Sequence, residues 1–157
     1  ITPSVCNLQP TSRGHVRLKT KDPKDAPAIS LNYLSTEADM DVAVAGLRAT
    51  RRIMAAKALS RFEPTEWKPG IEFSDDTELA RVAGDLGTTI FHPVGTCKMG
   101  NDELAVVNDR LAVRGIFGLR VIDASIMPRI TSGNTNAPTV MIAEKGAEFV
   151  RQDKDAR

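Results

Sequence analysis

The sequence has few of the residues that hold a small disulfide-rich or metal-binding fold together. Among its 157 residues are two cysteines, Cys6 and Cys97, and two histidines. The cysteines lie far apart and form no C-x-x-C motif, so neither a zinc site nor a disulfide framework is expected. We therefore predict a site without a metal ion.

An excess of charge and a long apolar run are missing as well. Lysine and arginine total 21 against 20 aspartate and glutamate residues, which gives a net charge of +1 at pH 7. A nucleic-acid partner is not expected from this balance. The longest uncharged stretch, residues 130–143, contains several polar residues and a proline, so no transmembrane segment is predicted. Nothing at the start resembles a signal peptide, and we expect a cytoplasmic protein, with peripheral association with a membrane left open.

The composition that remains, 41% apolar and 26% charged residues, is typical of one soluble globular domain. Apolar and polar residues alternate over residues 15–19 and again over residues 28–33, which predicts two antiparallel strands. Two further strands are predicted at residues 106–108 and 119–123, with a glycine-framed turn before the second.

Three helices are expected between and after these strands. A capping box at Thr36 and Asp39 predicts the start of the longest helix, whose apolar stripe continues to Ala58. Residues 74–78, of which 75, 76 and 78 are acidic, predict the start of the second helix, and Pro138 predicts the start of the third. This order of elements indicates an α+β fold, in which an antiparallel sheet has helices packed on one face.

Two polar segments are candidates for chemistry. His92 lies in a loop with proline and glycine neighbours, and histidine is the side chain best suited to moving a proton near neutral pH. Residues 132–139 are uncharged and lead into the third helix, whose free N–H groups stabilise negative charge. Each segment also has a purely structural interpretation, as a hydrogen-bonded loop histidine and as a well-capped helix, and local sequence leaves both open.

Three motifs occur together and carry a resemblance to a known family. They are H-P-x-G-T-C-x-M-G at residues 92–100, G-L-R-V-x-D-A-S at 118–125 and G-N-x-N-A-P-T at 133–139. In this order and spacing the chain resembles the C-terminal part of the glucose-methanol-choline (GMC) family of FAD-dependent oxidoreductases, of the choline and alcohol dehydrogenase type. The resemblance covers nearly the whole sequence.

The resemblance implies that an alcohol is oxidised to a carbonyl compound by hydride transfer to FAD. It places His92 beside the substrate hydroxyl, where it accepts the proton or hydrogen-bonds the developing alkoxide. It places Asn136 where an amide donates a hydrogen bond to the substrate oxygen. The implied flavin-lining residues are Asp123, Ala124, Asn136, Ala137, Pro138 and Thr139. The third helix would direct its positive end at the flavin edge that becomes anionic on reduction.

One part of the family pattern is missing, namely the G-x-G-x-x-G turn that holds the FAD pyrophosphate. We therefore expect a C-terminal segment of a longer enzyme, whose partner is the missing N-terminal FAD-binding half. Residues 1–116 would belong to the substrate-binding domain and include the His92 loop, and residues 117–157 would return to the FAD-binding domain. Alone, the segment is expected neither to bind FAD tightly nor to turn over. Residues 126–140 are expected to be exposed, which favours a homo-oligomer.

Several alternatives stay open at this point. A non-enzymatic binding or structural module that kept the flavoenzyme fold is the competing interpretation. Dehydrogenase and oxidase are not distinguished by these residues. The five Phe, one Trp and one Tyr offer little aromatic surface for a quaternary ammonium, which favours a broader range of small alcohols over choline.

Overall fold

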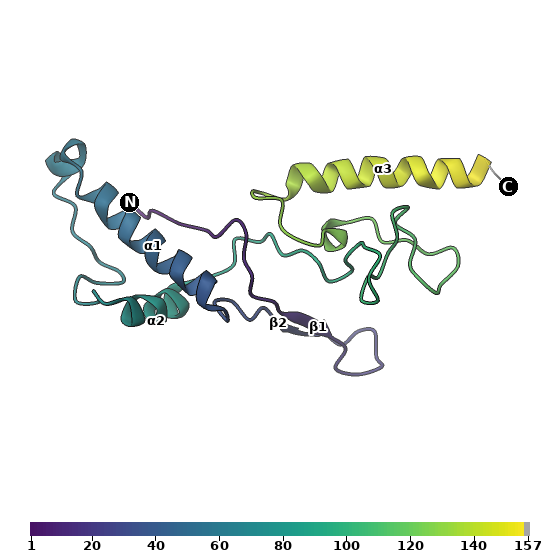
Figure 1. Cartoon of the computed structure of the whole chain (residues 1–157), viewed down its shortest axis with the longest axis horizontal. Helices are drawn as coiled ribbons and strands as arrows, with labels where there is room; N and C mark the ends of the chain where they lie inside the picture. Colours follow the sequence, from purple (N-terminus) through teal and green to yellow (C-terminus); the bar gives the residue numbers. More distant parts are fainter. Residues whose placement is uncertain (156–157) are drawn as a thin grey trace. The chain divides into compact units, whose positions relative to one another are not determined.

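The computed structural model describes residues 1–155, and its chain forms two compact units. The first is Ile1–Ile90, and the second runs from Phe91 to the end of the described residues. The elements in chain order are β1 (His15–Arg17), β2 (Ala28–Ser30), α1 (Glu37–Met54), the 3-10 helix η1 (Lys57–Phe62), α2 (Asp76–Leu86), the 3-10 helix η2 (Ala124–Ile126) and α3 (Asn136–Asp155) (Figure 1). None of the helices within residues 1–155 has the length and apolarity needed to cross a membrane.

The first unit contains the one sheet that the described residues form, an antiparallel pair of β1 and β2 in which His15 faces Ser30. Both strands are shorter than predicted. Leu18 and Tyr33, near the ends of the predicted runs, are 87% and 53% exposed, so burial gives little support to a longer pairing. The predicted domain boundary between residues 116 and 117 refers to the two domains of a longer enzyme, and it stays a prediction.

Helix α1 packs against α2 through a small core of Val44, Leu79 and Val82. The core-facing stripe of α1 is therefore confirmed, but its predicted continuation to Ala58 is wrong. The helix ends at Met54 because the chain after it turns back, and the Arg51 guanidinium holds it there by bonds to the Glu66 carboxylate and the Gly70 carbonyl.

The start of α1 has half of the predicted capping box. The Thr36 hydroxyl accepts a hydrogen bond from the Asp39 backbone N–H, as expected. The Asp39 carboxylate does not reach back to the cap. It is 3% exposed and accepts hydrogen bonds from the Asn7 side chain, from the backbone and hydroxyl of Thr11, and from the Ser12 backbone at 2.8 Å. A buried carboxylate needs several donors, and this one binds the N-terminal segment to α1.

The predicted packing of helices on one face of a sheet is wrong in detail. The middle side chains of β1 and β2, Val16 and Ile29, are 48% and 62% exposed. Helix α1 packs on α2, and α3 packs on η2. The fold is α+β in content, and helix-to-helix contacts provide the core of the first unit.

In the second unit the strands predicted at residues 106–108 and 119–123 are replaced by isolated bridges. Val107 pairs singly with Met99 and with Val113. The Asn108 side chain accepts hydrogen bonds from two backbone N–H groups of the following turn, and this turn ends each pairing after one residue. The predicted turn itself is present, since both of its glycines have positive φ.

The core of the second unit lies between α3, η2 and these bridged loops. Its buried members are Val107, Leu111, Ile126, Met127 and Ile142. The expectation that residues 126–140 are exposed is thus wrong for Ile126 and Met127, while Val140 is 54% exposed. Helix α3 begins at Asn136, slightly before the predicted Pro138.

The close approach of α3 to Ile122, in the segment before η2, depends on Gly146. We expect Gly146→Ala to destabilise the second unit. A Cβ atom at this buried position would lie 2.4 Å from Cγ2 of Ile122. Alanine gains about 1 kcal/mol of helix propensity over glycine, but overpacking costs about 1–3 kcal/mol, so the net effect should be a loss. Urea unfolding followed by circular dichroism measures it.

The matched control is Gly84→Ala in α2, where the nearest atom to an added Cβ is Cδ1 of Leu34 at 4.0 Å. With room for the methyl group, only the propensity gain remains, and the variant should be more stable by about 0.5–1 kcal/mol. Equal stabilisation by both substitutions would show that α3 does not need the close contact at Gly146.

Candidate active site

His92 lies against the residue that precedes α3. Its Nδ1 atom is 2.9 Å from the Thr135 hydroxyl oxygen and 3.4 Å from the Thr135 backbone nitrogen. Thr135 is 7% exposed and is followed directly by Asn136, the first residue of α3. The structure therefore brings together the two segments that carry the predicted catalytic residues, His92 and Asn136.

Main-chain hydrogen bonds hold the His92 loop beside η2. The Cys97 N–H donates to the Ser125 carbonyl at 3.0 Å, and the Met99 N–H donates to the Ile126 carbonyl at 2.8 Å. Gly95 has φ +93°, and a Cβ there would lie 3.4 Å from the Met127 carbonyl oxygen, so the loop passes close to the chain after η2. The first two motifs of the sequence are thus neighbours in space.

Asp123 and Ala124 mark the start of η2. The exposed Asp123 carboxylate caps this short helix by accepting a hydrogen bond from the Ser125 N–H at 2.8 Å. Ala124 is half-buried and contributes to the core under α3. Because α3 packs on η2, Asp123 and Ala124 belong to the same cluster of segments as His92.

The N-terminus of α3 can receive a negatively charged group. Asn136 and Ala137 are exposed, and the N–H groups in the first turn of a helix have no acceptor within the helix. The first turn of α3 contains no acidic residue, in contrast to α1 and α2. The Thr139 hydroxyl is already used, since it donates to the Thr135 carbonyl at 2.6 Å. The residues present therefore fit the anionic edge of a reduced flavin through backbone donors.

Thr135 is the site residue that sequence reasoning missed. It occupies the variable position of the third motif, between Asn134 and Asn136. Threonine is a typical N-cap residue, and Thr135 lies a few residues before the predicted helix start at Pro138, which is the one local signal it gave. Its partner, His92, is 43 residues away in the sequence, so no local pattern indicates their contact.

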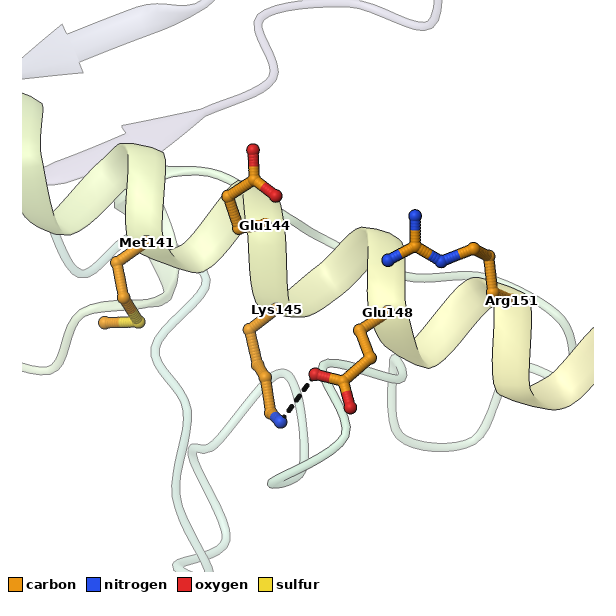
Figure 2. Close-up of a pocket in the computed structure, with 5 residues that line it drawn as sticks. All are labelled: Met141, Glu144, Lys145, Glu148 and Arg151. Atoms are coloured by element: carbon orange, nitrogen blue, oxygen red, sulfur yellow. Dashed lines mark hydrogen bonds and ion pairs between the residues drawn. The ribbon is translucent and has the colours of Figure 1, made fainter.

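A surface hollow lies along α3 and is lined by Met141, Glu144, Lys145, Glu148 and Arg151 (Figure 2). Lys145 forms an ion pair with Glu148 at 2.7 Å and holds the pKa of that carboxyl below its usual range. None of the predicted site residues lines this hollow. The candidate active site is therefore the start of α3 with the His92 loop.

Comparison with known proteins identifies the family of the chain. The GMC oxidoreductase family model matches residues 10–143, so the chain belongs to the GMC oxidoreductase family. The matched range includes every residue predicted to act in catalysis or to line the flavin.

The chain is similar to individual proteins with known names. Over 147 residues the chain is 50% identical to an oxygen-dependent choline dehydrogenase of Klebsiella pneumoniae subsp. pneumoniae, covering 94% of this chain and 26% of that protein. Among solved structures, it is similar to a pyridoxine 4-oxidase from Mesorbium loti, with a TM-score of 0.86, 34% identity and coverage of 92% and 28% of the two chains. An FAD-dependent oxidoreductase from Chaetomium thermophilum gives a TM-score of 0.87, 30% identity and coverage of 94% and 26%. The chain spans about a quarter of the length of these relatives.

Proposed function

We propose that this chain carries the active-site histidine and the flavin-facing helix of an FAD-dependent enzyme that oxidises an alcohol to a carbonyl compound. One observation carries the proposal. The contact between His92 and Thr135 places the imidazole against the residue that directly precedes Asn136, the first residue of α3. A histidine, an amide and a helix N-terminus in one place are the groups that this reaction needs.

Oxidation of an alcohol removes a hydride from carbon and a proton from oxygen. Bound FAD would supply the hydride acceptor. His92 would accept the proton or stabilise the developing alkoxide by a hydrogen bond, and Asn136 would donate a hydrogen bond that orients the substrate oxygen. An amide does not take up a proton at neutral pH, so the two residues have different roles.

The flavin would be held on one side by the backbone at the start of α3. Asn136 and Ala137 would offer N–H groups there, and Pro138, Thr139, Asp123 and Ala124 would line the ring. The 157 residues contain no G-x-G-x-x-G turn, so this chain provides no pyrophosphate site of that kind. We expect the chain alone to bind FAD weakly and not to turn over; the expected self-association stays a prediction.

Choline is the first substrate to test, because relatives at about half identity are named choline dehydrogenases. The low aromatic content of the sequence favours a broader range of small alcohols, so these are tested beside choline.

The test compares the purified chain with an enzyme in which it is joined to a family FAD-binding half. The chain alone, mixed with FAD and desalted, should be colourless and inactive. In the joined enzyme, anaerobic choline should bleach the flavin absorbance. An isolated chain that stays yellow and uses an alcohol to reduce an artificial electron acceptor would contradict the proposal that the other half is needed for FAD binding and turnover. A joined enzyme that binds FAD but oxidises neither choline nor other small alcohols would favour the non-enzymatic module.

A further inference from the structure

The end of α1 and the chain that leads from it toward α2, residues 52–73, expose four large apolar side chains. They are Ile53, Phe62, Trp67 and Ile71, which are 63%, 59%, 87% and 78% exposed. This segment lies at the end of α1 that is away from the β1–β2 pair (Figure 1). Large apolar side chains that gather in one exposed segment indicate a surface that binds something.

Arg51 holds this segment against the end of α1. Its guanidinium donates to the Glu66 carboxylate at 2.8 Å and to the Gly70 carbonyl at 2.9 Å. The residues that directly follow these two acceptors are Trp67 and Ile71. The side chains of the Arg51–Glu66 ion pair are 27% and 18% exposed. This partly buried pair therefore fixes the backbone that carries two of the exposed apolar side chains.

Cations accompany the apolar side chains. The Lys68 ammonium lies over the Trp67 ring, 5.2 Å from the ring centre, and the Arg61 guanidinium lies over the Phe62 ring at 4.6 Å. The cations of the segment that form no ion pair within residues 1–155 are Arg52, Lys57, Arg61 and Lys68. Each of the two exposed rings thus has a cation beside it that is not neutralised by a carboxylate.

This composition fits the surface of an anionic lipid bilayer better than it fits another protein. Tryptophan beside lysine and arginine is typical of membrane interfaces, where the ring lies among the headgroups. In contrast, lysine is depleted in the buried core of protein–protein interfaces. Outside the Arg51–Glu66 pair, the acidic residues of the segment are Glu63 and Glu72. Four cations against two acids give the segment a charge that is complementary to anionic headgroups.

We propose that residues 52–73 bind the surface of a membrane that contains anionic lipids, with Trp67 inserted among the headgroups. Phe62 and Ile71 add apolar contact, and Lys68 and Arg61 bind lipid phosphates beside the rings that they cover. The attraction is partly electrostatic, so it weakens as salt is added. The proposal is independent of the proposed function, because membrane binding requires neither flavin nor substrate.

The first test follows the fluorescence of Trp67 in the whole chain, which reports on this segment alone because the sequence has no other tryptophan. Vesicles of mixed phosphatidylglycerol and phosphatidylcholine should shift the emission to shorter wavelength. Vesicles of phosphatidylcholine alone should shift it much less, and added salt should reverse the shift. An emission that is unchanged by both kinds of vesicle, or is shifted equally by both, would overturn the proposal.

The second test measures how much of the joined, FAD-loaded enzyme sediments with the anionic vesicles. Trp67→Ser should lower the partition coefficient about tenfold, the effect of losing one inserted apolar side chain. Lys68→Glu should lower it about fivefold for each of its two units of charge. The matched controls are Phe117→Ser, at an aromatic residue of the second unit that is 97% exposed, and Lys24→Glu, at an exposed lysine between β1 and β2. Both should bind like the parent.

The remaining outcomes decide between the possible partners of this surface. If the isolated chain binds anionic vesicles but the joined enzyme does not, the proposal is wrong and the segment belongs to the contact with the FAD-binding half. Equal losses in the Trp67 and Phe117 variants would indicate unspecific apolar adsorption and would also overturn it. A joined enzyme that binds the vesicles through Trp67 but oxidises no alcohol would support this proposal while contradicting the proposed function.

Discussion

Replacing His92 with alanine is expected to lower kcat of the FAD-loaded enzyme by roughly a hundredfold to ten-thousandfold, the usual contribution of a residue that assists proton movement at the reacting oxygen. The methyl group of alanine can neither donate to nor accept from the substrate oxygen. Nothing else in the cluster replaces it, because Asn136 is an amide and the Thr135 hydroxyl faces the vacated ring position. Steady-state kinetics with choline, at constant flavin content, measures the loss.

The matched control is His15→Ala, which removes the other histidine from an exposed position on β1. It should leave kcat within about twofold of the parent, as is usual for a surface substitution away from the site. A His92→Ala enzyme that retains more than about a tenth of the parental kcat would contradict the assigned role, since general acid–base assistance is worth more than that.

Acid is expected to destabilise the first unit through Asp39. Burial by itself raises the pKa of this carboxyl, but hydrogen bonds from Ser12 and Thr11 outweigh burial and lower the pKa from 3.8 to about 2. Because the folded chain holds the proton less tightly than the unfolded chain, the stabilisation is fully present above about pH 4. It is lost as the pH falls toward 2, and its size is about 2 kcal/mol. Urea unfolding at a series of pH values between 2 and 6 follows the loss.

Asp39→Asn should remove this contribution at neutral pH as well. The asparagine amide has one acceptor oxygen, and its NH₂ group would face the donors of Thr11 or Ser12, so about 2–3 kcal/mol of unfolding free energy should be lost. Asp41→Asn is the control, since Asp41 is exposed on the same helix. If Asp39→Asn unfolds with the stability and the acid dependence of the parent, the carboxylate does not hold the N-terminal segment.

The elements predicted correctly are those specified by local sequence. Thr36 caps α1 and Asp75 caps α2, each through a side chain that accepts a backbone N–H a few residues ahead. Such interactions depend on spacing alone, so a pattern reveals them. The strands at residues 106–108 and 119–123 were wrong because short apolar runs also suit buried loops, and only their surroundings decide between the two.

Long-range partners explain what the sequence could not show. The capping rule predicted a local bond for Asp39, but its carboxylate binds Thr11 and Ser12, 28 and 27 residues away. For the site, the motifs and the family resemblance indicated His92 and Asn136. The contact that joins their segments, through Thr135, appears only once the chain is folded.

The attachment of the His92 loop to η2 determines which residues of the loop can be substituted without displacing His92. The bonds at Cys97 and Met99 join backbone atoms to backbone atoms. Every residue type except proline supplies the same N–H, so substitutions at Cys97 and Met99 can keep these two bonds, whereas Gly95 is restricted by its positive φ. The position of the loop beside η2 therefore depends on these backbone bonds more than on the identity of the two side chains. Under the proposed function, we therefore expect substitutions at exposed neighbours such as Thr96 to leave the position of His92 unchanged.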